Sequence, residues 1–324
     1  CIALLFYRGE IIWSISGLET TVYQALVAFS LFYLLKALGY KHDSFDRDKI
    51  NTHAFALSGF LMALASLTRP EAPCLMLLFF AIAWFDKPKT TKTIFLNGFS
   101  FGILIFCLIY IPYFIWRWLY YERLLPNPVY CKGITDSFFS LVDKNYLILA
   151  WPFLMLSLFS FRTRSDKRPY YFLLSSVVYL ILLMRADPVV TFDNRLFLPV
   201  FSLLLPIAFL GLKQCIDYFI PEERSPNHFT FFVAAFLVLF FFIPMRSLEG
   251  YRQFSMAPQR GEQIRQQAID WLSKEGTSGS NVVLADSGMI PYYSSLNFID
   301  SYCLNNREMT RQLDGQLYYR FCHQ

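Results

Sequence analysis

Long apolar runs, each followed by a short polar connector, make up the first 245 residues of the chain. Runs of this length predict helices, and repeated runs with few charges predict helices that cross a membrane. The pattern therefore predicts an all-α polytopic membrane protein, in which the truncated end of a first helix precedes about eight spans. The expected spans cover residues 19–40, 53–68, 72–86, 94–117, 146–162, 169–185, 196–213 and 229–245.

The connectors between these runs alternate in charge. One set is rich in lysine and arginine, and the positive-inside rule places such connectors in the cytoplasm. The other connectors then face the opposite compartment, together with everything after residue 245. These outer segments carry the unusual polar motifs of the chain, so the motifs gather on one membrane face. The basic connectors lie at residues 41–49, 87–92, 162–168 and 213–224.

Two of the expected spans are short. Residues 53–68 and 72–86 would form helices of about 23 Å, whereas the hydrocarbon core of a bilayer is about 30 Å thick. The connector Arg69-Pro70-Glu71 is therefore expected below the membrane surface, where non-helical backbone survives only inside protein or beside water. The sequence thus predicts a recess on the non-cytoplasmic side, with Arg69 and Glu71 at its floor.

The composition becomes more polar after Met245. Residues 1–245 are the expected transmembrane domain, and residues 246–324 predict a small soluble α/β domain on the non-cytoplasmic side. In this second part, apolar spacing predicts a helix from about 259 to 274, then a strand, a turn with a short helix, and a second strand. The expected strands cover residues 282–285 and 297–302.

Two connectors share the spacing Ser/Thr-x-x-Glu directly before an apolar run, from Ser16 to Glu19 and from Thr68 to Glu71. One interpretation is a capping box, in which hydroxyl and carboxylate satisfy free backbone amides. The other is a phosphate site, because free amides and the positive end of the helix dipole favour an anion. Arg69 supports the second interpretation, since an arginine at membrane depth costs roughly 2.5–3.5 kcal/mol and needs an anionic partner. Glu71 or a lipid phosphate could be that partner.

The segment from Arg117 to Lys132 also has two interpretations of equal weight. An aromatic belt at the membrane interface explains Trp118 and Tyr120. A rigid loop that binds a sugar phosphate better explains Pro126-Asn127-Pro128, because two prolines fix an extended path.

Asp193-Asn194-Arg195 directly precedes the span expected at 196–213. Asp193 could simply cap that helix. Arg195 runs against the usual charge bias of an outer connector, which favours an anionic partner for its guanidinium.

The composition agrees with a membrane protein and gives no sign of nucleic-acid or metal binding. The chain is 55% hydrophobic, 19% aromatic and 16% charged, whereas a soluble domain has about 25% charged residues. The net charge of +5 is spread over short loops, so no nucleic-acid partner is expected. The seven cysteines and four histidines show no metal-ligand spacing, so no metal or other cofactor is predicted. A divalent cation requirement and pairing among Cys131, Cys303 and Cys322 stay open.

Five motifs follow one another along the chain, at Trp13–Thr20, Leu67–Glu71, Tyr120–Lys132, Asn194–Pro199 and Asp286–Tyr293. In this order they resemble bacterial GT-C glycosyltransferase-like membrane proteins, in the arabinofuranosyltransferase-like group that includes flagellar motor control proteins. The resemblance spans nearly the whole chain. It implies a GT-C-like helix bundle in the cell inner membrane, with the C-terminal domain in the periplasm. It also implies sugar transfer from a polyprenyl-phosphate donor to a cell-envelope glycan or glycolipid acceptor.

The resemblance further implies roles for single residues. The acidic catalytic residue of such enzymes lies in the first extracytoplasmic loop, which is expected upstream of Cys1, so no catalytic residue is assigned. Basic side chains would neutralise the leaving phosphate. Ala72 and Pro128 depart from the family pattern and leave the sugar open. The residues expected to line the donor site are Glu19, Arg69, Glu71, Arg117, Tyr121, Asn127, Lys132 and Arg195.

Two other classes of protein fit a polytopic chain. A transporter or flippase for a lipid-linked or anionic solute would carry polar residues in the middle of its spans, and here the span centres are nearly all apolar. A non-catalytic membrane assembly protein with the same fold would lack the upstream acidic residue. Only the upstream sequence separates this class from the enzyme.

Overall fold

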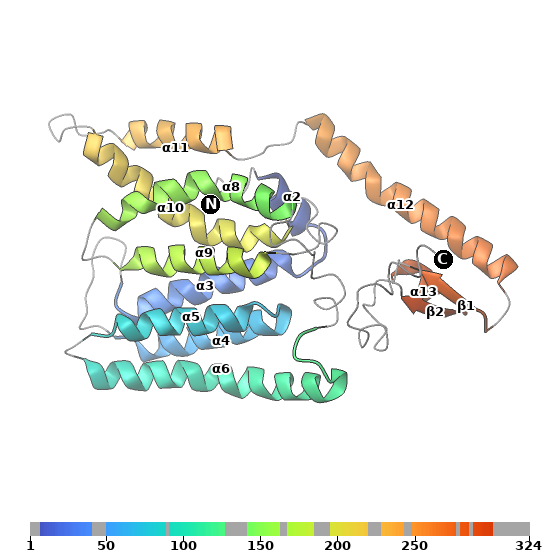
Figure 1. Ribbon diagram of the computed structural model, residues 1–324, viewed down its shortest axis with the longest axis horizontal. Coiled ribbons are helices and arrows are strands. Elements are labelled where there is room, and N and C mark those ends of the chain that lie inside the picture. Colours follow the sequence, from blue (N-terminus) through green and yellow to red (C-terminus); the bar gives the residue numbers. More distant parts are fainter. Residues whose placement is uncertain are drawn as a thin grey trace. The chain divides into compact units, whose positions relative to one another are not determined.

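Figure 1 shows the computed structural model of the chain, which is mostly helical. The structure describes residues 7–40, 50–88, 91–126, 141–162, 167–184, 195–219, 228–242, 248–276, 279–284 and 288–300.

Each expected apolar run contains a helix, so the positions of the predicted helices are confirmed. In the described part of the chain, three helices are long and apolar enough to cross a membrane: Thr20–Ala37, Lys92–Tyr121 and Arg195–Phe219. Whether the other apolar runs also cross the membrane stays a prediction.

A short helix, α2 (Arg8–Ser14), comes before the first run. The runs form α3 (Thr20–Ala37), α4 (Thr52–Thr68), α5 (Ala72–Phe85), α6 (Lys92–Tyr121), α8 (Leu141–Leu158) with the 3-10 turn η1 (Phe159–Arg162), α9 (Arg168–Leu183), α10 (Leu198–Phe219) and α11 (His228–Phe242).

Local signals in the sequence set several of the helix ends. The Oδ1 atom of Asn51 accepts a hydrogen bond from the amide of Ala54 at 3.1 Å and so caps α4. Helices α5 and α9 carry Pro73 and Pro169 in their first turns, where a missing N–H costs nothing. Helix α3 ends just before Gly39, whose φ of 85° lies in the left-handed region that favours glycine.

The chain divides into two compact units. Unit 1 comprises Cys1–Arg117 and Ser137–Met245, and unit 2 comprises Trp118–Asp136 and Arg246–Gln324. In unit 1 the helices run side by side (Figure 1), with α3 against α4 and α10, and α10 against α8 and α9. We call the end of the unit where α2 ends and α3 and α5 begin the motif end. The opposite end, where α3 and α5 end and α9 begins, is the basic end.

Glycines permit two close helix crossings in unit 1. A Cβ atom placed on Gly59 of α4 would lie 2.1 Å from the carbonyl oxygen of Gly102 in α6. A Cβ atom on Gly211 of α10 would lie 1.8 Å from the carbonyl oxygen of Leu156 in α8. Both distances are far inside van der Waals contact with backbone atoms, which cannot rotate away. These crossings therefore depend on the absence of a side chain.

A buried carboxylate ties the helices together at the basic end. Asp86 follows α5, and its Oδ2 atom accepts hydrogen bonds from the hydroxyls of Tyr40 at 2.7 Å and Tyr171 at 3.3 Å. Lys167 pairs with Oδ1 of Asp86 at 3.0 Å. The guanidinium of Arg168 lies 6.0 Å from the ring centroid of Tyr40. This network joins the ends of α3 and α5 to the start of α9.

Unit 2 contains a small parallel strand pair. Helix α12 (Leu248–Glu275) precedes β1 (Asn281–Leu284), α13 (Met289–Tyr293) and β2 (Asn297–Asp300). Strands β1 and β2 pair in parallel, with Asn281 opposite Asn297, and α13 forms the crossover. The order of elements after Met245 is the predicted one. Helix α12 begins well before the predicted start at about 259. Pro258 lies in the extra range, and proline is disfavoured inside helices, so the sequence pattern pointed to a later start.

Candidate functional site

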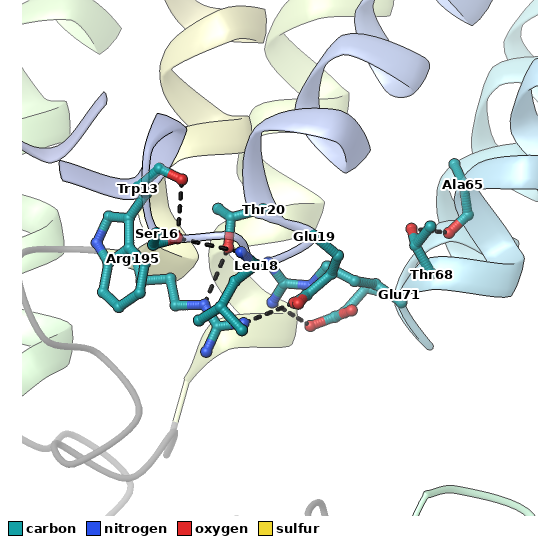
Figure 2. A network of polar contacts seen from close by, with 10 residues as sticks. Trp13, Ser16, Leu18, Glu19, Thr20, Ala65, Thr68, Glu71 and Arg195 are labelled. Carbon is teal, nitrogen blue, oxygen red and sulfur yellow. Dashed lines mark hydrogen bonds and ion pairs between the residues drawn. The ribbon is translucent and has the colours of Figure 1, made fainter. Parts of the chain in front are cut away.

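Arg195 is held at the motif end by three side chains from the α2–α3 region (Figure 2). Its Nη2 atom donates a hydrogen bond to Oε1 of Glu19 at 2.7 Å, and its Nε atom donates to Oγ1 of Thr20 at 2.9 Å. Its guanidinium lies 5.1 Å from the ring centroid of Trp13, in a cation–π arrangement. The exposed fraction is 20% for Arg195 and 36% for Glu19, so this pair stays in contact with solvent.

Arg69 forms a second ion pair, which is buried. Its Nη2 atom donates a hydrogen bond to Oε1 of Glu71 at 3.1 Å. Only 6% of the Arg69 side chain and 19% of the Glu71 side chain are exposed. The guanidinium of Arg69 lies 5.1 Å from the ring centroid of Tyr23 in α3. The connector between α4 and α5 therefore places a fixed positive charge against the first turns of α3.

The two ion pairs belong to one electrostatic cluster. Burial by itself lowers the pKa of the Arg69 guanidinium, but Tyr179, Glu71 and other neighbours, Glu19 among them, outweigh burial and raise the pKa above its ordinary value. Glu19 thus acts on Arg69 while it hydrogen-bonds Arg195. We call Arg195, Glu19, Arg69 and Glu71 the arginine–glutamate cluster. The sequence named all four residues as site candidates, and the structure brings them together.

The capping-box interpretation is wrong for both connectors. The residues at the N-caps of α3 and α5 are Glu19 and Glu71, and neither side chain makes a capping hydrogen bond. The Oγ1 atom of Thr68 donates to the carbonyl oxygen of Ala65 at 2.7 Å. Ser16 Oγ accepts from the amide of Leu18 at 3.2 Å and donates to Trp13. Each glutamate instead bonds an arginine, and in that hydrogen bond both partners are charged, whereas in a cap only the carboxylate is.

Four buried polar atoms beside Arg69 have no hydrogen-bond partner in the part of the chain that the structure describes. They are Nη1 of Arg69, Oε2 of Glu71 and the hydroxyl oxygens of Tyr23 and Tyr179. The hydroxyls of Tyr23 and Tyr179 lie within hydrogen-bonding reach of each other, but the angles of this contact fall short of hydrogen-bond geometry. An unsatisfied buried polar group costs about 1–3 kcal/mol. These four groups make the surroundings of Arg69 a candidate site for a polar partner.

Tyr23 and Tyr179 are site residues that the sequence did not reveal. Both are fully buried, in α3 and α9, and their ring centroids lie 6.3 Å apart. Each lies within an apolar run, where an aromatic residue is predicted to be part of the hydrophobic core. The hydroxyl group is the one feature of these residues that could have indicated a site. A tyrosine in such a run carries a hydroxyl that must find a partner, whereas phenylalanine does not.

Of the other predicted site residues, the structure describes two. Arg117 is buried near the end of α6, with its guanidinium 5.3 Å from the ring centroid of Phe114. Tyr121 packs against Tyr120 in unit 2 at 4.8 Å between ring centroids. Asn127 and Lys132 lie outside the described residues.

Other sequence predictions also fall outside the described residues. These include Asp193 as a helix cap and pairing among Cys131, Cys303 and Cys322. Cys74, Cys107 and Cys215 are free thiols. Within the described ranges, no three histidine, cysteine or acidic side chains come together in a way that could hold a metal ion.

Among known families, the one described as a domain of unknown function (DUF8728) matches residues 252–324. This match lies within unit 2 and covers much less than half of the chain. No curated protein matches the chain, and no solved structure matches it.

Proposed function

We propose that this protein is an integral membrane glycosyltransferase of the GT-C type. It transfers a sugar from a polyprenyl-phosphate donor to a cell-envelope glycan or glycolipid acceptor outside the cytoplasm. The observation that carries the proposal is the pair of arginines in the arginine–glutamate cluster. Arg69 and Arg195 come from distant connectors, and both lie where helices begin, so their charges and the helix dipoles favour one anion.

The two arginines are suited to different tasks. Arg195 and Glu19 are partly exposed, so Glu19 can turn away and leave Arg195 to bind a phosphate oxygen. Arg69 and Glu71 are buried and stay paired. Arg69 therefore adds a fixed positive potential behind the phosphate, and Arg195 makes the direct contact. Positive charge at the phosphate stabilises it as the leaving group when the bond to the sugar breaks.

The distribution of buried charge supports an enzyme over a transporter. In the described part of unit 1, the buried charged side chains are Arg69, Asp86 and Arg117. Arg69 precedes α5, Asp86 follows α5, and Arg117 lies in the last turns of α6. A transporter would place such groups near the middle of its helices, around a central binding site. Buried charge at the ends of helices, rather than near their middle, is typical of chemistry at a membrane surface.

The proposal places the motif end and the C-terminal domain in the periplasm and the basic end in the cytoplasm. A test is labelling with a membrane-impermeant maleimide in a cysteine-free background. Ser16→Cys lies on the exposed α2–α3 connector, and Thr93→Cys lies in the exposed first turn of α6 at the basic end. We expect labelling of Ser16→Cys from outside, and of Thr93→Cys only after the membrane is permeabilised. Labelling of both variants from outside would contradict this topology.

The direct test of function is the Arg195→Ala variant of the full-length protein. We expect sugar transfer from polyprenyl-phosphate donors to fall by about 10²–10³-fold, the effect of removing one group that stabilises transition-state charge. Arg168→Ala is a matched control, because Arg168 also faces an aromatic ring but lies at the basic end. Arg168→Ala should keep wild-type activity. Full activity of Arg195→Ala, or equal loss in both variants, would contradict the proposal.

A further inference from the structure

We propose that Tyr23 and Tyr179 contact the ligand, and that with Arg69 and Glu71 they bind a hydroxyl group of the transferred sugar. This inference rests on the proposed glycosyltransferase function and adds the part of the site that recognises the sugar. It assigns a binding role to two side chains that sequence patterns place in the apolar core. Its basis is the set of unpartnered buried atoms beside Arg69.

The four atoms come from three separate segments. Tyr23 belongs to α3, Tyr179 belongs to α9, and Arg69 and Glu71 lie in the connector between α4 and α5. Both tyrosines and Arg69 are more than nine-tenths buried. Folded proteins pair most of their buried polar atoms. Unpartnered atoms from three segments around one guanidinium therefore indicate a site for an external polar group.

The kinds of atom in the set identify the chemistry of that group. The tyrosine hydroxyls and Arg69 Nη1 can donate hydrogen bonds, whereas Oε2 of Glu71 can only accept one. A phosphate diester has no proton to donate, so it would leave Oε2 of Glu71 without a hydrogen bond. A hydroxyl accepts hydrogen bonds from up to two of these donors and gives its own proton to Glu71. A sugar hydroxyl fits this set, and a water molecule has the same chemistry.

The position of the set relative to Arg195 suits a sugar attached to a phosphate. Tyr23 follows Glu19 by four residues on α3, so both side chains lie on one face of the helix, about one turn apart. Glu19 bonds Arg195, and Tyr23 lies against Arg69. The backbone positions of Glu19 and Tyr23 are therefore about 6 Å apart along the axis of α3. A single monosaccharide can bridge that distance.

Tyrosine-to-phenylalanine variants test the proposal because they remove only the hydroxyls. The ring of Tyr23 packs on Arg69 and lies against the ring of Tyr179, and phenylalanine keeps this packing. Neither hydroxyl has a protein partner among the described residues. We therefore expect the melting temperature of Tyr23→Phe, Tyr179→Phe and the double variant to stay unchanged or to rise.

The experiment compares two probes on the full-length protein in detergent. One is a short-chain prenyl phosphate, and the other is the same prenyl phosphate linked to each of a panel of hexoses and pentoses. We expect the double variant to bind the best sugar-linked probe about 10–100-fold more weakly, which corresponds to one or two lost hydrogen bonds. Its affinity for the bare prenyl phosphate should not change. Arg195→Ala should weaken the binding of both probes.

Each other outcome contradicts either the sugar-binding inference alone or the proposed function as well. If the double variant binds both probes like the wild type, the hydroxyls meet only water, and this inference is wrong while the proposed function stands. If its melting temperature and its affinity for both probes fall together, the hydroxyls stabilise the fold, and the inference is again wrong. If the wild type binds neither probe, the proposed function fails and the inference fails with it.

Discussion

Replacing Gly59 with alanine should separate α4 from α6 and cost about 3 kcal/mol of folding stability, the upper part of the usual range for overpacking. The added methyl group would meet the carbonyl oxygen of Gly102 at 2.1 Å. That oxygen belongs to a helix backbone, so no side-chain rotation relieves the contact and the helices must move apart. The measurement is the thermal unfolding midpoint in detergent, together with the yield of monodisperse protein.

Two further glycine variants test whether the loss of stability comes from the close helix crossing. Gly211→Ala should behave like Gly59→Ala, because its methyl group would meet the carbonyl oxygen of Leu156 at 1.8 Å. Gly261→Ala in α12 is the control. Its nearest neighbour is Nη1 of Arg265 at 3.1 Å, the mobile tip of a long side chain. Alanine is a better helix former by about 1 kcal/mol, so this variant should be neutral or stabilised. Equal stability of Gly59→Ala and Gly261→Ala would contradict the close crossing.

These crossings mark the boundary of what the sequence could predict about the fold. The apolar runs predicted each helix, because long runs bounded by polar connectors leave few alternatives. The spacing Gly98-x-x-x-Gly102 is a readable sign of a close-packed helix face. The sequence could not predict that Gly59 is the residue that packs against this face. Pairing between helices depends on shapes of surfaces that lie far apart in the sequence.

The candidate site was predictable to a similar extent. Glu19, Arg69, Glu71 and Arg195 stood out because charged groups beside apolar runs are costly unless they have partners. The sequence could not decide between a cap and an ion pair, since that depends on which guanidinium comes within reach of each carboxylate. Tyr23 could not be found, because a buried tyrosine and a buried phenylalanine give the same apolar pattern. Its importance follows from its missing hydrogen-bond partner.

Stability and ligand binding should separate in variants of the Arg69–Glu71 pair. Arg69→Met leaves Glu71 buried without its cation, and breaking a buried ion pair in this way costs about 3–5 kcal/mol. The double variant Arg69→Met/Glu71→Met removes both charges and fills the space with apolar groups. Such replacements are often neutral or stabilising. We expect the double variant to unfold within about 1 kcal/mol of the wild type, because Glu19 keeps Arg195 as its partner.

The double variant can then be used to test whether Arg69 contributes to phosphate binding as well as to folding stability. If Arg69 supplies the positive potential behind a bound phosphate, the stable double variant should bind a prenyl phosphate at least about 10-fold more weakly, a loss near 1.4 kcal/mol. Thermal unfolding and prenyl-phosphate titration of the same preparations give both numbers. Wild-type affinity in a stable double variant would show that phosphate binding does not need the pair. The phosphate would then be held by Arg195 without Arg69, since a buried ion pair that can be replaced by methionines contributes neither stability nor binding.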